Sequence, residues 1–473
     1  MQTTGAQRAD FSGRFIRIMA LGDSITEGGS TFSAYTYPLW EKLYAGGYQV
    51  EFVGSRTIQT RTGEFKNEGR GGWNAESIAQ EFEKNFPNHI ADVLLIHCGH
   101  NHEADEKPIP AIVAANASMI ATARRSNPQI YIFLAQVIPS GKLPKYRYLP
   151  ELNIELKRLA EKLDTPVSRV IAVDQATGFD WRTDTIEDHV HPNALGAEKI
   201  ASRWFEAVAR TLPRNAPVYQ PEIIAYKKIG DSSLILHIFK PEGGPRATPR
   251  PAIVFFFGGG WVHGTPLQFY PECAHFASKG FVAITADYRI KTVDDTTPFE
   301  SDADGKSAIR WVRAHAHEWG IDPHRIAAAG ASAGGQVAAF TALVPGQDDP
   351  ADDLSISAQS NALLVWYGVV DNGPEGYGPP EMKARYAEIS PRHNIADNPP
   401  PCLFLLGTSD EYVPVKTAEA FQAEFVRHGG RCDLHLFPGA HHPLYPYRDS
   451  QAPLRSKVLS LADQFLDSIG FVP

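Results

Sequence analysis

The chain has 473 residues, of which 43% are hydrophobic and 21% are charged, and its formal net charge is -9 at pH 7. This length favours two domains over a single core, and the composition is ordinary for a soluble globular protein. The negative charge argues against nucleic acid or an anionic membrane surface as the main partner, and no apolar window reaches the roughly 18 residues that a membrane span needs.

The N-terminal segment, residues 1–13, is polar and lacks the apolar core of a secretory signal peptide. The compartment therefore stays open, and secretion or a periplasmic location would require a leader that was trimmed. The four cysteines form no metal-type or redox pair. Free buried thiols are expected, with a Cys402–Cys432 bridge as the alternative because each of these two opens an apolar, strand-like run.

Apolar runs alternate with amphipathic stretches through the first half of the chain. The runs cover residues 15–19, 93–96, 130–134 and 170–173, and a clear helical segment covers residues 197–211. Strands separated by helices indicate βαβ units, a parallel sheet and the α/β fold class.

The first apolar run leads into Gly22-Asp23-Ser24-Ile25-Thr26. A serine between the carboxyl end of a strand and a helix is well placed to face a substrate. Alone, this motif also fits a plain helix N-cap. Three further segments support a site: the glycine-rich loop 68–73, residues 99–102 after a strand, and residues 188–193, whose Asp188 and His191 can present both side chains to one serine.

Together these segments resemble the SGNH, or GDSL-type, hydrolase family over residues 14–212, which implies a flavodoxin-like α/β/α sandwich. The resemblance implies that Ser24 is the nucleophile, that His191 is the general base and then the acid, and that Asp188 orients the imidazole. It also implies an oxyanion hole formed by the backbone N–H groups of Ser24 and Gly72 and by the side-chain amide of Asn101.

The sequence departs from the family pattern at His102, where the family often has aspartate. This leaves the geometry of that loop open. His97, His100 and His102 also raise the alternative of a metal site. We expect none there, because strand alternation would not bring the three rings together and no carboxylate spacing supports ligation. His189 is expected to be structural or to lie at the rim.

Residues 213–221 contain three prolines in nine positions and predict a linker between two domains. Beyond it, residues 223–226 and 234–239 flank Gly230-Asp231 and predict an antiparallel hairpin. Short, nearly continuous apolar runs then suit strands covered on both faces of a mostly parallel sheet. These runs are 253–257, 282–285, 326–329, 363–366 and 403–406.

The run 326–329 leads into Gly330-Ala331-Ser332-Ala333-Gly334 and a helical stretch. Small residues around the serine permit the strained strand-to-helix turn of a nucleophile elbow, although a plain helix start is the alternative. Three other segments agree: 257–261 ends a strand and offers backbone donors, 407–414 places Asp410 in a loop, and 438–443 carries two histidines.

Residues 222–473 resemble the α/β-hydrolase fold, closest to hormone-sensitive-lipase-like esterases and related carbohydrate esterases. The resemblance implies that Ser332 attacks, that His442 shuttles the proton and that Asp410 orients the imidazole. His441 stays open as an alternative base and Asp371 as an alternative acid.

The same resemblance implies an oxyanion hole formed by the backbone N–H groups of Gly259, Gly260 and Ala333. The family has His-Gly-Gly-Gly where this chain has Phe257 in place of the histidine. A hole built from backbone survives that change, but the rigidity of the loop is in question.

The two resemblances imply a bifunctional serine carbohydrate esterase that removes acetyl, and possibly feruloyl, groups from plant polysaccharides such as xylan. Its expected partner is an acylated oligo- or polysaccharide, and no metal or organic cofactor is expected. Trp73, Trp181 and Trp261 are candidates for stacking on sugars, with packing as the alternative role. Two other functions stay open: one active esterase domain with a degenerate carbohydrate-binding domain, and a general short-chain carboxylesterase or lipase.

Overall fold

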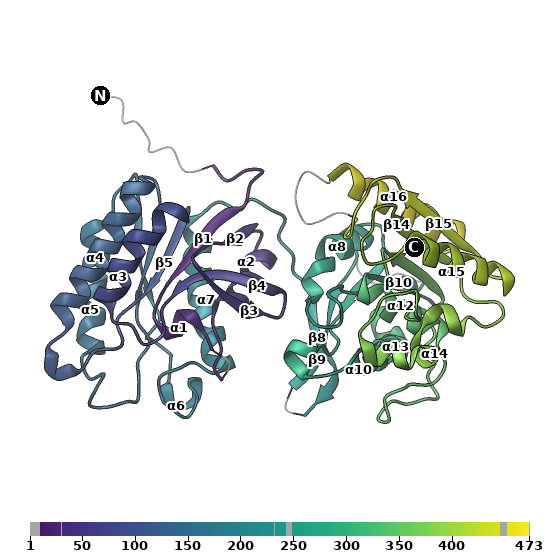
Figure 1. The fold of residues 1–473 in the computed structure, drawn as a ribbon, viewed down its shortest axis with the longest axis horizontal. Coiled ribbons are helices and arrows are strands. Elements are labelled where there is room, and N and C mark those ends of the chain that lie inside the picture. The colour runs from purple at the N-terminus through teal and green to yellow at the C-terminus, as the bar shows by residue number, and fades with distance from the viewer. Residues whose placement is uncertain (1–9, 30, 231, 243–247, 445–451, 473) are drawn as a thin grey trace. The chain divides into compact units, whose positions relative to one another are not determined.

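The computed structural model describes residues 10–29, 31–230, 232–242, 248–444 and 452–472 (Figure 1). The chain divides into two compact units, Met1–Tyr219 and Gln220–Pro473. Residues 213–221 contain no helix or strand. Within them, the backbone N–H groups of Asn215 and Ala216 donate to the carbonyl of Gly47, so this part of the segment packs on the first unit.

The first unit is built on a sheet with the order β3-β4-β1-β5-β6-β7, in which β2 also pairs with β1. Among the described strands, all pairings in this sheet are parallel except β3 with β4. The strands are β1 Ile16–Gly22, β2 Val50–Phe52, β3 Arg56–Thr60, β4 Gly63–Gly69, β5 Val93–His97, β6 Tyr131–Gln136 and β7 Val170–Asp174. The helices are α1 Ser24–Glu27, α2 Thr36–Ala45, α3 Ala75–Asn85, α4 Ile109–Ser126, α5 Leu149–Leu163, α6 Trp181–Asp184 and α7 Ala194–Thr211.

Alternation along the central strands gives this sheet two apolar faces. Ile16 and Ile18 of β1 pack in one buried cluster with side chains of α2 and α7. Met19 and Leu21 of the same strand pack in a second cluster, with side chains of α3, α4 and α5. The helices therefore cover the sheet from both sides, as Figure 1 shows, and the predicted α/β/α sandwich is confirmed.

The second unit is an eight-stranded sheet with the order β15-β14-β13-β12-β10-β11-β9-β8. Its strands are β8 Glu222–Ile229, β9 Ser232–Phe239, β10 Arg250–Phe256, β11 Val282–Ala286, β12 Ile321–Ala331, β13 Ala362–Trp366, β14 Cys402–Gly407 and β15 Cys432–Phe437. Only the pairings β8–β9 and β9–β11 among the described strands are antiparallel. The predicted antiparallel hairpin is confirmed, although Asp231 at its turn lies outside the described residues.

The described helices of the second unit are α8 Tyr270–Ser278, α9 Lys291–Asp294, α10 Pro298–Ala314, α11 Ala316–Trp319, α12 Ala333–Leu343, α13 Pro380–Ala384, α14 Tyr386–Ile389, α15 Val415–Arg427 and α16 Ala452–Ser468. Every residue of α12 is buried. This is possible because α12 is mostly apolar, with Gln336 and Thr341 as its polar residues, and starts with small residues that let the backbone approach the sheet closely. The mostly parallel α/β-hydrolase sheet is confirmed.

All four cysteines are buried and free, as expected. Cys402 and Cys432 lie opposite each other in register between β14 and β15 without forming a bridge. Within the part of the chain that the structure describes, no helix is both long enough and apolar enough to cross a bilayer.

Candidate active sites

The turn between β1 and α1 places Ser24 at the carboxyl end of the first sheet. Asp23 caps α1, because its Oδ1 accepts a hydrogen bond of 3.0 Å from the N–H of Ile25. The turn also needs glycine at position 22, where a Cβ would lie 2.3 Å from the carbonyl oxygen of His97. Ser24 is therefore held between two close-packed strand ends.

Ser24, His191 and Asp188 form one hydrogen-bonded relay. The Nε2 of His191 lies 2.8 Å from the Oγ of Ser24, and its Nδ1 contacts the Oδ2 of Asp188. Partial burial works to raise the pKa of Asp188, but hydrogen bonds from the His191 ring and from the N–H groups of His191 and Val190 outweigh it and lower that pKa. Phe32 stacks on the His191 ring, with the ring centroids 4.2 Å apart. The carboxylate thus stays ionised beside the imidazole that it orients.

The glycine-rich loop after β4 runs beside Ser24. A Cβ at Gly71 would lie 3.8 Å from the Cβ of Ser24, and the N–H of Gly71 donates to Glu27 at 2.7 Å. The next residue, Gly72, lines a surface cavity of about 410 Å³ together with Asn101. The structure therefore brings both predicted oxyanion residues to one hollow next to the serine loop.

The Asn101 side chain is held in a fixed orientation. Its Nδ2 donates to the carbonyl of Trp73 at 3.0 Å, and its Oδ1 accepts from the hydroxyl of Tyr146 at 3.3 Å. An amide nitrogen carries two N–H bonds, so one of them is left for a ligand. Asn101 adopts left-handed backbone with φ 68°, a conformation that asparagine tolerates better than most residues.

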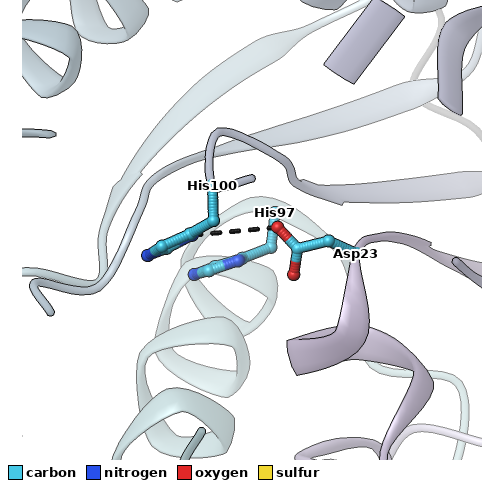
Figure 2. A group of neighbouring side chains, drawn as sticks. All are labelled: Asp23, His97 and His100. Carbon is cyan, nitrogen blue, oxygen red and sulfur yellow. Dashed lines mark ion pairs between the residues drawn. The ribbon is translucent and has the colours of Figure 1, made fainter. Parts of the chain in front are cut away.

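His97, His100 and His102 do not all come together, but two of them meet at a carboxylate, which the spacing along the chain did not predict. His97 and His100 converge on Asp23, with their rings parallel within 10° and their centroids 6.0 Å apart (Figure 2). Strand alternation does not prevent this, because His100 lies beyond the end of β5. His102 lies apart and contacts Glu76 and Glu106 instead.

The second serine stands on a sharp turn between β12 and α12. Ser332 has φ 53° and ψ -123°, a strained conformation for a residue with a side chain. This is the geometry that a nucleophile elbow requires, because it pushes the hydroxyl out of the turn. The elbow closes because Gly330 lies against the backbone of Gly334, where any Cβ at position 330 would lie 2.1 Å from the carbonyl oxygen.

A Gly330→Ala substitution should therefore destabilise the second domain. The neighbouring atoms belong to backbone that cannot move without displacing Ser332, so we expect a loss of at least about 2 kcal/mol in the free energy of unfolding. Thermal unfolding measures it, with the unfolding transition of the first domain as the internal control. An unchanged Tm of the second domain would show that the elbow tolerates a methyl group.

Ser332, His442 and Asp410 form a second relay. The Nε2 of His442 lies 2.9 Å from the Oγ of Ser332, and its Nδ1 lies 2.8 Å from the Oδ2 of Asp410. The other oxygen of Asp410 accepts from the N–H groups of Tyr412 and Val413. The side chain of Asp410 is fully buried and that of His442 is 10% exposed, so the relay is shielded from water.

The two open alternatives in this domain have other partners. The Nδ1 of His441 contacts Glu411, and its side chain is 66% exposed. Asp371 is bound by Arg392 at 2.5 Å and by the N–H of Gly373 at 2.8 Å. Among the four candidates, the structure therefore brings only His442 and Asp410 to Ser332.

The loop after β10 carries the predicted backbone donors Gly259 and Gly260. Gly259 has φ 135°, and a Cβ there would lie 2.0 Å from the carbonyl oxygen of His263, so no other residue fits the turn. Gly258 lies beside the serine, because a Cβ there would lie 3.2 Å from that of Ser332. The donor loop and the elbow with Ala333 thus meet around one serine.

Phe257 is held firmly where the related family has histidine. Its ring stacks on Tyr288 with the centroids 4.0 Å apart, and the Tyr288 hydroxyl donates to the Phe257 carbonyl at 2.6 Å. At the other end of the loop, Trp261 is buried and its Nε1 donates to Gln336, which itself donates to Asp302. These contacts brace the loop at both ends.

The three tryptophans proposed for sugar stacking differ in exposure. Trp261 is buried, which excludes stacking on a ligand at the surface. Trp181 is half-buried against His189, whose carbonyl also accepts from Ser140, so His189 has the expected structural role. Trp73 is 42% exposed and lines the cavity beside Gly72 and Asn101.

Sequence reasoning missed several residues that shape the sites. They are Phe32 over His191, Tyr367 and Tyr412 against the edge of His442, and Gln336 and Asp302 behind Trp261. Except for Tyr412, which lies in the segment 407–414, none of them stands in a motif that the sequence analysis singled out. Only Gln336 had a usable signal, as a polar residue within an otherwise apolar helix.

Two families of ester hydrolases match this chain. The GDSL-like Lipase/Acylhydrolase family matches residues 20–199, and the BD-FAE family matches residues 236–425. The two matches follow each other along the chain, and each includes one of the two serines. They agree with the predicted tandem of a GDSL-type domain and an α/β-hydrolase domain.

Curated relatives and solved structures point the same way. The probable carboxylic ester hydrolase LipM of Mycobacterium tuberculosis is 30% identical over 337 residues, which cover 67% of this chain and 74% of LipM. The esterase LipC of the same organism is 27% identical over 61% of this chain and 75% of LipC. A propionate-bound thermophilic esterase of Thermogutta terrifontis is 41% identical, with a TM-score of 0.51 over 53% of this chain and 95% of that chain.

Proposed function

We propose that both domains of this chain are active serine esterases of acylated carbohydrates. The chain belongs to the carboxylic ester hydrolases, as a GDSL-type domain followed by an α/β-hydrolase domain. The observation that carries this proposal is the pair of separate relays. Each consists of a hydroxyl, an imidazole and a carboxylate within hydrogen-bonding reach. Such a relay is what acyl transfer through a serine ester needs.

The same sequence of steps suits both sites. The imidazole takes the proton of the serine hydroxyl as the oxygen attacks the ester carbonyl, and it returns that proton to the departing alcohol. Water then attacks the acyl-serine with the same imidazole as base, which releases the acid and restores the hydroxyl. Asp188 and Asp410 accept hydrogen bonds from the Nδ1–H groups of the two rings and so orient them.

The negative charge on the tetrahedral intermediates needs donors that are already in place. In the first domain these are the N–H groups of Ser24 and Gly72 and the free N–H of Asn101. In the second they are the N–H groups of Gly259, Gly260 and Ala333. Each such donor stabilises the transition state by about 3–4 kcal/mol. The three donors of the second domain are backbone groups, so they do not depend on a histidine in place of Phe257.

The cavity beside Asn101 supports a hydroxylated alcohol as the leaving group in the first domain. Its wall on α3 presents the polar side chains of Ser77, Gln80, Glu81 and Lys84, and its main aromatic surface is Trp73. Polar groups next to an aromatic face suit a sugar ring, which is apolar on its faces and hydroxylated at its edges. A long alkyl chain would displace water from these polar groups without replacing its hydrogen bonds. We therefore propose acetylated xylan-type oligosaccharides as the substrate of this domain.

For the second domain, the proposed substrates are short acyl or feruloyl esters of the same polysaccharides. The esterase of Thermogutta terrifontis, 41% identical, has been observed with propionate and with butyrate bound. This favours a short acyl group and keeps a general short-chain carboxylesterase as the second candidate. Comparing kcat/KM for acylated oligosaccharides with kcat/KM for a series of p-nitrophenyl esters, both in the Ser24→Ala variant, decides between the two. The general carboxylesterase predicts no higher kcat/KM on the oligosaccharides.

A Trp73→Ala substitution tests the carbohydrate proposal. In a Ser332→Ala background, we expect KM for acetylated xylo-oligosaccharides to rise about five- to tenfold, because stacking contributes about 1 kcal/mol or slightly more. For p-nitrophenyl acetate, whose leaving group carries no sugar, kcat/KM should change less than about twofold. Trp73→Phe is the matched control and should recover most of the loss. An equal effect on both substrates would contradict a sugar subsite in this cavity.

A further inference from the structure

Behind Ser24 lies a buried group of three titratable side chains that the proposed chemistry does not use. Asp23, His97 and His100 come from the ends of the adjacent strands β1 and β5, and their side chains are at most 2% exposed. Figure 2 shows the two rings lying side by side next to the carboxylate, with the His100–Asp23 pair dashed. The Nδ1 of His100 lies 3.7 Å from the Oδ2 of Asp23, which is too far for a direct hydrogen bond.

Each member of the group has one unpaired polar atom. The Oδ2 of Asp23, the Nδ1 of His97 and the Nδ1 of His100 are buried without a hydrogen-bonding partner among the described residues. One polar atom of each of the three residues lies within 4.8 Å of the others. An unpaired buried polar group costs about 1–3 kcal/mol, so three in one place indicate a small shared ligand.

The peptide group of Ile138, just after β6, fixes the protons on both rings. The Nε2 of His100 lies 3.2 Å from the Ile138 carbonyl, so this nitrogen carries the proton and donates it. The Ile138 N–H donates to the Nε2 of His97 at 3.4 Å, so that nitrogen is bare. Burial lowers the pKa of His97 to about 4 and that of His100 to about 3, so both rings are neutral at neutral pH. His97 therefore carries its proton on Nδ1, and the Nδ1 of His100 is an acceptor.

We infer that Asp23, His97 and His100 form a binding site for a single buried water molecule that links the two catalytic loops of the first domain. The water accepts from the Nδ1–H of His97 and donates to the Oδ2 of Asp23 and to the Nδ1 of His100. One donor and two acceptors match the hydrogen-bonding capacity of one water molecule. A metal ion would need the Nδ1 of His97 as a bare ligand, which its proton prevents.

This water has a consequence for catalysis that rests on the proposed function of Ser24. Asp23 directly precedes the serine and caps its helix through the other carboxylate oxygen. His100 directly precedes Asn101, the proposed side-chain donor to the oxyanion. The water therefore fixes the attacking hydroxyl and the oxyanion donor relative to each other. Asp23, His97 and His100 are positioning residues for both.

A crystal structure of the unaltered full chain tests the water directly. We expect one density peak at hydrogen-bonding distance from all three unpaired atoms, with no anomalous signal. Metal analysis of the purified chain should find no stoichiometric transition metal, and a chelator should leave hydrolysis at the Ser24 site unchanged. A bound metal ion, or a dry site, would overturn the inference whether or not Ser24 proves catalytic.

A double-mutant cycle in the Ser332→Ala background tests the positioning role. Asp23→Asn keeps the helix cap but loses one acceptor, and His100→Leu removes the other. We expect each to lower kcat for p-nitrophenyl acetate about tenfold with KM within about twofold. The double variant should also lose about tenfold, because both act through one network.

The matched control is His102→Leu, because the His102 ring pairs with Glu76 outside the group, and its kcat should stay within about twofold. Additive losses near a hundredfold, or an unchanged kcat, would overturn the positioning role. If the Ser332→Ala chain itself shows no hydrolysis, the proposed function fails and the water is still judged by the crystal structure.

Discussion

Replacing Ser24 by alanine should leave the chain an active esterase, and so should replacing Ser332, whereas the double variant should lose hydrolysis of p-nitrophenyl acetate. Each relay is complete within one domain, since His191 and Asp188 serve Ser24 while His442 and Asp410 serve Ser332. Neither site borrows a group from the other. The two rates should therefore add in the unaltered chain.

The size of each effect follows from the role of the serine. Without the nucleophile no acyl-serine forms, and kcat at that site should fall about 10⁶-fold, to what the oxyanion donors and substrate binding provide alone. Each single substitution lowers the total rate only by the contribution of its own domain. Measuring kcat for both single variants and the double variant on acetylated xylo-oligosaccharide as well as on p-nitrophenyl acetate gives those shares.

The outcome separates the proposed function from its rivals. If one single variant loses all activity, the other domain is inert and the two-site proposal fails. Glycan binding that persists in that inert domain would then favour a degenerate hydrolase that only binds carbohydrate. An unchanged Tm of both variants shows that folding is intact, and we expect this because Ser24 and Ser332 each lose only a hydroxyl.

The central strands of both sheets could be predicted because they are covered on both faces and carry almost only apolar side chains. β3 and β4 could not. Much of β3 and the first half of β4 face solvent, so the polar sequence there has no apolar run to reveal a strand. Their pairing depends on the short turn between them and on β1, which is tertiary context.

The six relay residues could be predicted because each stands in a short motif. Four of them follow the end of a strand, whereas Asp188 and His191 lie just before α7. The buried group at Asp23 could not, since Asp23 is more than 70 residues from the two histidines and the proton pattern of the group depends on the peptide of Ile138. Spacing along the chain does not reveal that the three side chains converge, nor which ring nitrogens carry protons. The same holds for Phe257. Its ring stacks on Tyr288 and so supports the loop where the related family has histidine, and no sequence motif indicates this contact.

The adjacent histidines of the second domain offer the sharpest test of its relay. In a Ser24→Ala background, His442→Ala should lower kcat about 10⁶-fold, because the serine then has no base within reach. His441→Ala should change kcat less than about threefold. Its ring is mostly exposed and is bound to Glu411, so it cannot turn to Ser332 without displacing His442.

The carboxylates give the matching pair of variants. Asp410→Asn should lower kcat about 10⁴-fold, because the amide holds the imidazole in the wrong tautomer while leaving its position intact. Asp371→Asn should act on stability instead, since Asp371 binds Arg392 and does not reach the ring. Steady-state kinetics with p-nitrophenyl acetate measures all four variants. A loss at His441 equal to that at His442 would mean that the proton relay passes through both rings, and a loss at Asp371 equal to that at Asp410 would reassign the acid.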